Sequence, residues 1–161
     1  MEREPGRSAS KRSQALQLES GPMGAILAVL GCRGDVTIPE ALAAMCGRTA
    51  TRGAVSSLYA DGAGLAVQAI RGDASIAQRG HLLVGVHGYF TDGALSKSSD
   101  RLGETPASPA DLLAEEYLRS GESVLRRLRG DFSAVLVDSA LRTIVAIVNH
   151  VASRPLFHVC T

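Results

Sequence analysis

Apolar periodicity along the chain begins near residue 23, and the segment before it is polar. Residues 1–22 offer too few apolar side chains to offset the entropy lost on ordering, so we expect a flexible tail or an upstream extension. From Gly24 an unbroken apolar run ends at Gly31, which is the pattern of a short buried strand. We therefore expect Met23 to be the biological start and 23–161 to form the folded domain.

Helical signals occur in three later segments. Ile38–Gly47 has Thr37 as a plausible cap and a proline in its first turn, so a helix is expected there. The run Ser108-Pro109-Ala110-Asp111 predicts a second helix start, because it combines a serine cap, a proline at the first position and an early acid. This helix should break near Gly121, and a second short helix should follow it and end at Gly130.

Strand signals flank both helical regions. The dipeptide Asp61-Gly62 between two apolar runs is the strongest hairpin signal in the chain. The order of strands, helices and again strands predicts an α+β domain of two or more packed layers. The predicted strands after the first are Val55–Ala60, Gly64–Ile70, His81–Val86, Phe132–Val137, Thr143–Val148 and Leu156–Cys160.

Composition narrows the class of protein. The 161 residues suit one domain, and 45% hydrophobic with 20% charged residues is ordinary for a globular protein. A net charge of +1 gives no reason to expect nucleic acid or an anionic membrane as a partner. No apolar run approaches the roughly 18–20 residues that span a bilayer, and the three cysteines form no metal-ligand spacing. We expect a cytoplasmic protein without a bound metal.

Two downstream segments have a specific pattern. Residues 117–121 (YLRSG) are followed by 125–132 (LRRLRGDF), and the run 147–157 is IVNHVASRPLF. They resemble Tyr-x-x-x-Gly…Leu-x-x-Leu-x-Gly-x-Phe and Ala-Arg-Asp-x-x-Gly-x-Arg-Pro-Leu-Tyr of class-II glutamine amidotransferase domains. These are the N-terminal-nucleophile (Ntn) domains of asparagine synthetase and its relatives, and the resemblance extends over 23–161.

Earlier motifs match the same family in the same order. Family chains open with Met-Cys-Gly-Ile, where this chain has Met23-Gly24-Ala25-Ile26. Thr51-Arg52-Gly53 corresponds to the family's His-Arg-Gly, and His87-Gly88-Tyr89 corresponds to its Asn-Gly-Glu. The helix start at 108–111 corresponds to its Ser-Asp-x-Glu.

The resemblance implies a known chemistry from which this chain departs. In the family the N-terminal cysteine attacks glutamine, the free α-amine is the base, and Asn and Gly donors stabilise the oxyanion. Here Gly24 takes the nucleophile's position, His87 replaces Asn, and Pro109 replaces the Asp that binds the substrate amine. We therefore expect no catalytic residue. The vestigial substrate-binding candidates are Arg52, His87, Gly88 and Asp111.

Each candidate also has a simpler interpretation. Arg52 could be a carboxylate clamp or a solvated turn residue, and His87 could donate to an oxyanion or only bond at a strand end. Cys32 and Cys46 are the candidate replacement nucleophiles, although buried cysteines are commonly inert core residues. An arginine cluster could bind an acidic partner or form a solvated helix face beside nearby glutamates; its members are Arg126, Arg127 and Arg129.

The resemblance implies a four-layer αββα sandwich (Ntn-hydrolase-like), with further family strands expected beyond Thr161. It also implies a degenerate, non-hydrolytic N-terminal domain of an ATP-dependent amide- or lactam-forming enzyme. β-Lactam synthetase and some lasso-peptide macrolactam cyclases contain such domains. We expect a scaffold or substrate-recognition half for a peptide or small molecule, with no cofactor and no activity of its own. ATP and Mg²⁺ would belong to a synthetase domain on the same or an adjacent reading frame. The alternatives are an active glutaminase with an unrecognised nucleophile and a stand-alone binding module.

Overall fold

The computed structural model describes residues 24–31, 35–49, 53–69, 73–91, 95 and 107–151. Arg52, Cys32 and the predicted strand Leu156–Cys160 lie outside these described residues. The described elements confirm the predicted α+β class, since they comprise antiparallel sheets with two α-helices and a short 3₁₀ helix.

Sheet A contains the first strand and the predicted hairpin. Its strands are β1 (Ala25–Leu30), β2 (Ala54–Ala60) and β3 (Ala63–Ala69), in the order β1-β3-β2. All neighbouring strands are antiparallel. The turn between β2 and β3 places Gly62 at φ +66°, a conformation that glycine adopts at little cost. This confirms the hairpin that the dipeptide at 61–62 predicts.

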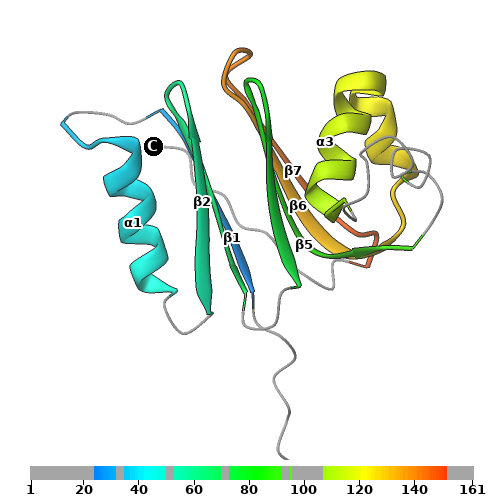
Figure 1. Ribbon diagram of the computed structural model, residues 1–161, viewed down its shortest axis with the longest axis horizontal. Helices are drawn as coiled ribbons and strands as arrows, with labels where there is room; N and C mark the ends of the chain where they lie inside the picture. The colour runs from blue at the N-terminus through cyan, green and yellow to red at the C-terminus, as the bar shows by residue number, and fades with distance from the viewer. Residues whose placement is uncertain are drawn as a thin grey trace, which may run out of the picture.

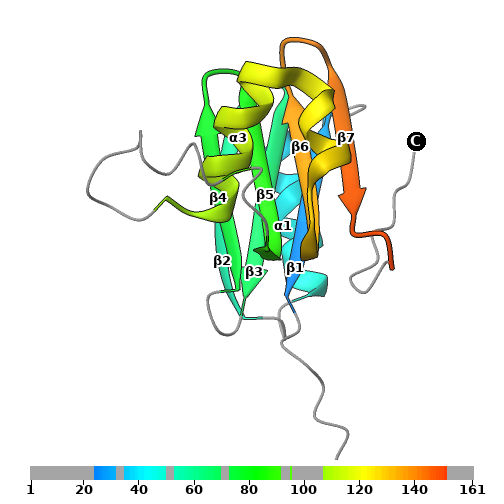
Figure 2. The same ribbon diagram turned by 90° about the vertical axis from the view of Figure 1, so that its right-hand side faces the viewer.

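Sheet B has four antiparallel strands in the order β4-β5-β6-β7. They are β4 (Ala74–Arg79), β5 (Leu82–Phe90), β6 (Gly130–Asp138) and β7 (Thr143–Val148). In Figure 2 the four strands lie behind α3, with β4 and β7 at opposite edges.

The helices begin where their caps predict. Helix α1 (Ile38–Arg48) has a complete capping box, in which the Thr37 N–H donates to Glu40 Oε2 at 2.9 Å and the Glu40 N–H donates back to Thr37. The Thr37 N–H and the Thr37 hydroxyl both donate to the Glu40 carboxylate, which lowers the pKa of this exposed carboxyl. Helix α3 (Pro109–Ser120) begins at the Ser108 cap and is followed by the 3₁₀ helix η2 (Gly121–Arg127).

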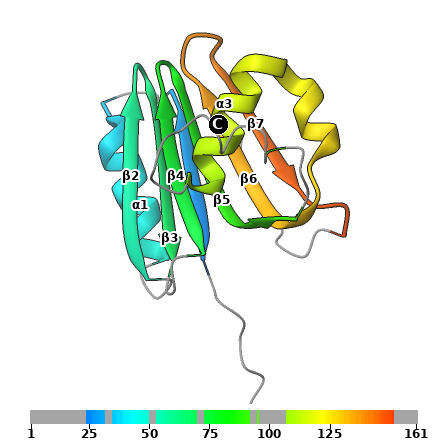
Figure 3. The same cartoon turned by 45° about the vertical axis from the view of Figure 1, so that its right-hand side comes forward.

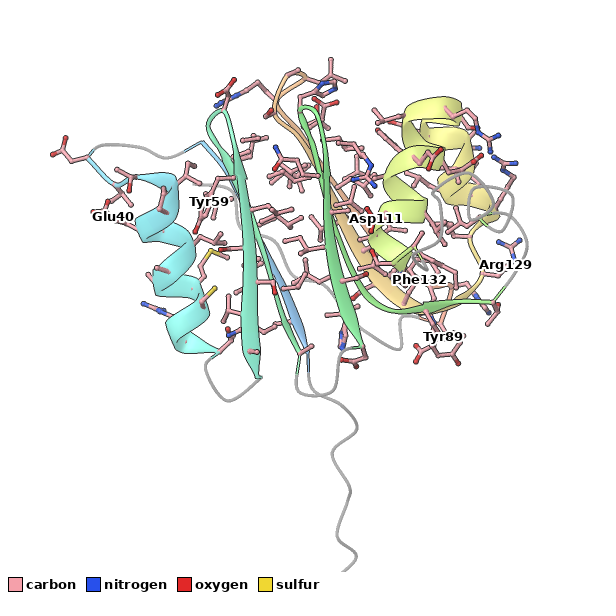
Figure 4. All side chains as sticks on the ribbon, viewed as in Figure 1. Glu40, Tyr59, Tyr89, Asp111, Arg129 and Phe132 are labelled. Atoms are coloured by element: carbon pink, nitrogen blue, oxygen red, sulfur yellow. The ribbon has the colours of Figure 1, made fainter. Side chains whose placement is uncertain are left out.

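The two sheets face each other, and a helix covers each outer face (Figures 1 and 3). Helix α1 packs on β1 and β3, whereas α3 packs on β4 and β5. Apolar side chains fill the space between the sheets, and a second core lies between sheet B and α3 (Figure 4). Neither helix is long and apolar enough to cross a bilayer, as far as the described segments extend.

Alternation along β5 decides which residues face the space between the sheets. Leu82, Val84 and Val86 belong to the core under α3. Leu83 belongs to the core between the sheets. Because successive strand side chains point to opposite faces, His87 lies on the same face as Leu83 and is directed toward sheet A.

The sequence pattern missed one strand and misplaced the ends of three other elements. The sequence pattern does not predict β4, because Ser75 and Gln78 interrupt its apolar residues. The predicted end of β5 at Val86 is wrong, because pairing with β6 continues to Phe90. The second helical segment is a 3₁₀ helix that ends at Arg127 rather than at a glycine stop. Similarly, Gly47 lies inside α1 and does not end it.

Candidate functional site

The N-terminal end of β1 lies directly against a histidine of sheet B. Gly24 immediately precedes β1, and a Cβ atom added to it would come within 2.7 Å of His87 Cδ2 and 2.8 Å of Cε1, and closer still to Nε2. Side-chain carbons do not approach other heavy atoms this closely. The His87 ring therefore occupies the space that a side chain at position 24 would need.

A carboxylate that the sequence analysis missed holds this ring. His87 Nε2 lies 2.9 Å from Asp73 Oδ2, and the His87 side chain is only 8% exposed. The register of sheet B pairs His87 with Ala74, which brings the preceding residue, Asp73, close to His87. Asp73 could have been recognised as a neighbour of His87 only from its position just before β4. The sequence pattern does not predict that strand.

Gly88 is fixed by its backbone. It has φ +105°, and an added Cβ would overlap the carbonyl oxygen of Asp131 and lie 3.0 Å from the carbonyl carbon. Only glycine fits this position without moving β6. The Gly88 N–H donates to the Asp73 carbonyl at 2.7 Å. The donor that the family resemblance assigns to an oxyanion hole is thus already used within the chain.

Asp111 is not brought to Gly24 and His87. It lies in the first turn of α3, on the face of sheet B opposite His87 (Figure 4). Its Oδ1 accepts from Arg79 Nη2 at 2.6 Å, and its Oδ2 accepts from Ser108 Oγ at 2.7 Å. Both carboxylate oxygens of Asp111 therefore have partners. The ion pair with Arg79 connects the start of α3 to β4.

Arg52 lies outside the described residues, so its predicted carboxylate clamp remains a prediction. Pro109 occupies the start of α3, where it has no side-chain donor or acceptor to offer a substrate amine.

Cys46, a candidate replacement nucleophile, lies on α1 near its C-terminal end. Partial burial raises the pKa of its thiol, which disfavours the thiolate that a nucleophile requires. Helix α1 covers the face of sheet A that points away from sheet B (Figure 1). Cys46 is therefore separated by a sheet from the His87 ring.

No group of three metal-ligating side chains occurs among the residues that the structure describes. The described site consists of one glycine, one buried histidine and one carboxylate. Such a set can hold a ring in place and can exchange a proton, but it contains no thiol or hydroxyl nucleophile at the end of β1.

Comparison with known proteins gives no match. No protein-family model matches the chain, and no curated protein matches its sequence. Any function assigned to the site therefore rests on its residues and their geometry.

Proposed function

We propose that the chain is a degenerate glutamine-amidotransferase-like domain that does not hydrolyse glutamine. Its fold would be the four-layer αββα sandwich of Ntn hydrolases. The order of helix, sheet, sheet and helix along the described layers supports that fold. The motifs of the resemblance, from Gly24 to the pattern at 147–157, support the family.

The contact between Gly24 and His87 is the observation on which the lack of activity rests. In the family that the chain resembles, the residue at the start of the first strand supplies the thiol. Here that residue has no side chain, and the His87 ring fills the adjoining space. An acyl-enzyme intermediate needs a nucleophile at this point, so none can form there.

Two of the other substrate contacts expected from the resemblance are engaged within the chain. The Gly88 N–H donates to Asp73, and the Asp111 carboxylate is bonded to Arg79 and Ser108. Glutamine could use the Gly88 N–H only by displacing the Asp73 carbonyl, and breaking such a neutral hydrogen bond costs about 0.5–1.5 kcal/mol. Asp111 lies on the opposite face of sheet B, where it cannot meet a substrate placed beside Gly24.

The domain would act as a scaffold or substrate-recognition half for an ATP-dependent synthetase domain, on the same or an adjacent reading frame. ATP and Mg²⁺ would bind that synthetase domain, which would form the amide or lactam bond. The alternative of an active glutaminase needs another nucleophile, and the raised pKa of Cys46 argues against that thiol. A stand-alone binding module would have no such partner, so co-purification with a synthetase would count against it.

The glutaminase test uses the full chain. Purified protein is incubated with glutamine, and released glutamate and ammonia are measured against a sample without protein. We expect no release above that background, because Gly24 supplies no nucleophile at the position where the family thiol would stand.

A Cys46→Ser variant is the matched control for this assay. Turnover that survives repurification of the full chain would overturn the proposal. Loss of that turnover in the variant would identify Cys46 as the nucleophile and support the alternative of an active glutaminase.

A further inference from the structure

A half-open cleft lies where η2 leads into β6, beside the end of β7. Its volume is about 420 Å³. Four apolar side chains line it, and two of them, Leu128 and Phe132, are almost completely buried. The other two are Leu125 and Val148. Leu125 is partly exposed and Val148 is 37% exposed, so these two residues offer apolar surface to a ligand.

The described residues of the polar lining include arginine, histidine and asparagine but no carboxylate. Arg126, Arg129 and His150 supply it, together with Asn149. The Arg129 Nη1 group donates to the carbonyl oxygens of Leu128 at 2.8 Å and Arg126 at 3.2 Å, which fixes the guanidinium at the cleft. Figure 4 shows Arg129 and Phe132 on the side of the molecule that contains α3 and η2.

The arginines of this region divide into two groups. Arg119 and Arg127 both pair with the buried carboxylate of Glu116, which explains their position on the helix surface. Arg126 and Arg129 form no ion pair with any carboxylate that the structure describes, and both line the cleft. Arg126 and Arg129 thus leave two cationic side chains at the cleft whose charge no described carboxylate neutralises.

We propose that this cleft binds a small organic carboxylate with an apolar body. The volume falls within the range of about 300–1,000 Å³ typical of small-molecule sites. The apolar body would pack against Leu125 and Val148, and the carboxylate would accept from the guanidinium groups, whose forked donors match its two oxygens. This site is on the α3 side of sheet B and does not depend on the proposed function.

The test compares three ligands that separate the two parts of the recognition. The full chain is titrated by calorimetry with N-acetyl-L-phenylalanine, with its amide, which has the same body without the charge, and with acetate, which has the charge without the body. We expect saturable binding of the acid and at least about tenfold weaker binding of the other two, because each lacks one set of contacts.

Two single variants locate the binding. Arg126 is exposed and has no hydrogen bond from its side chain among the described residues, so Arg126→Ala should fold normally and weaken the acid's binding about tenfold. Arg48→Ala removes the same charge from the exposed C-terminal turn of α1 and should leave binding unchanged. Thermal unfolding confirms that each variant is folded.

The proposal is overturned if the acid does not bind saturably at millimolar concentration, or if the amide binds as tightly as the acid. Equal effects of Arg126→Ala and Arg48→Ala would also overturn it, since they would indicate general charge attraction rather than this cleft.

Discussion

Replacing Gly88 with alanine should lower the free energy of unfolding by about 3 kcal/mol or more. Two costs add at this position. The backbone has φ +105°, which L-residues rarely adopt, and the new Cβ would overlap the carbonyl oxygen of Asp131 on the neighbouring strand. The clash is with backbone in the middle of sheet B, so β5 and β6 would have to separate to relieve it.

Gly80→Ala is the matched control for that variant. Gly80 also has a positive φ, +58°, but an added Cβ there would meet no atom within 4 Å. Gly80→Ala should therefore lower the free energy of unfolding by only about 1 kcal/mol, the cost of holding alanine at a positive φ. Urea unfolding of both variants measures the difference. Equal losses of stability would mean that β5 and β6 do not approach closely at Gly88.

Replacing Gly24 with alanine should also be destabilising, by about 1–3 kcal/mol, although its Cβ meets a side chain rather than backbone. The obstacle is the His87 ring, which Asp73 holds in place at 2.9 Å. The ring can move away only by giving up that bond and its buried position. The cost should therefore depend on whether the histidine is present.

A double-mutant cycle measures this dependence. His87→Ala alone should destabilise the protein by about 1–3 kcal/mol, because it leaves Asp73 without this partner and opens a cavity. In the Gly24→Ala background, His87→Ala also removes the overlap between the new Cβ and the ring. There His87→Ala should therefore lower the free energy of unfolding by about 1 kcal/mol or more less than it does in the wild-type background. Strictly additive effects in urea unfolding would show that the two residues are not in contact.

Local chemistry made several elements predictable from the sequence. The Thr37 and Ser108 caps place the starts of α1 and α3, because each side chain satisfies a backbone N–H of the first turn. The β2–β3 hairpin follows from the dipeptide at 61–62, because a tight turn needs glycine at a positive φ. These signals require no knowledge of the rest of the chain.

Other features depend on contacts between distant segments. The strand β4 has only weak apolar alternation, and its pairing with β5 makes it a strand. The pairing of β4 with β5 brings Asp73 close to His87. The sequence alone could not reveal their contact, because it does not predict that pairing. The closeness of Gly24 and His87 was expected only from the family resemblance, since the two residues belong to different sheets.

The most direct test of the account is a nuclear Overhauser measurement on the full chain. We predict strong cross-peaks between the α-protons of Gly24 and the ring protons of His87, because the ring fills the space beside that glycine. Cross-peaks between Leu83 and Leu65, which share the core between the sheets, provide the internal reference. If the reference peaks are present and the Gly24–His87 peaks are absent, the ring does not fill the space beside Gly24 and the proposed reason for a lack of glutaminase activity fails.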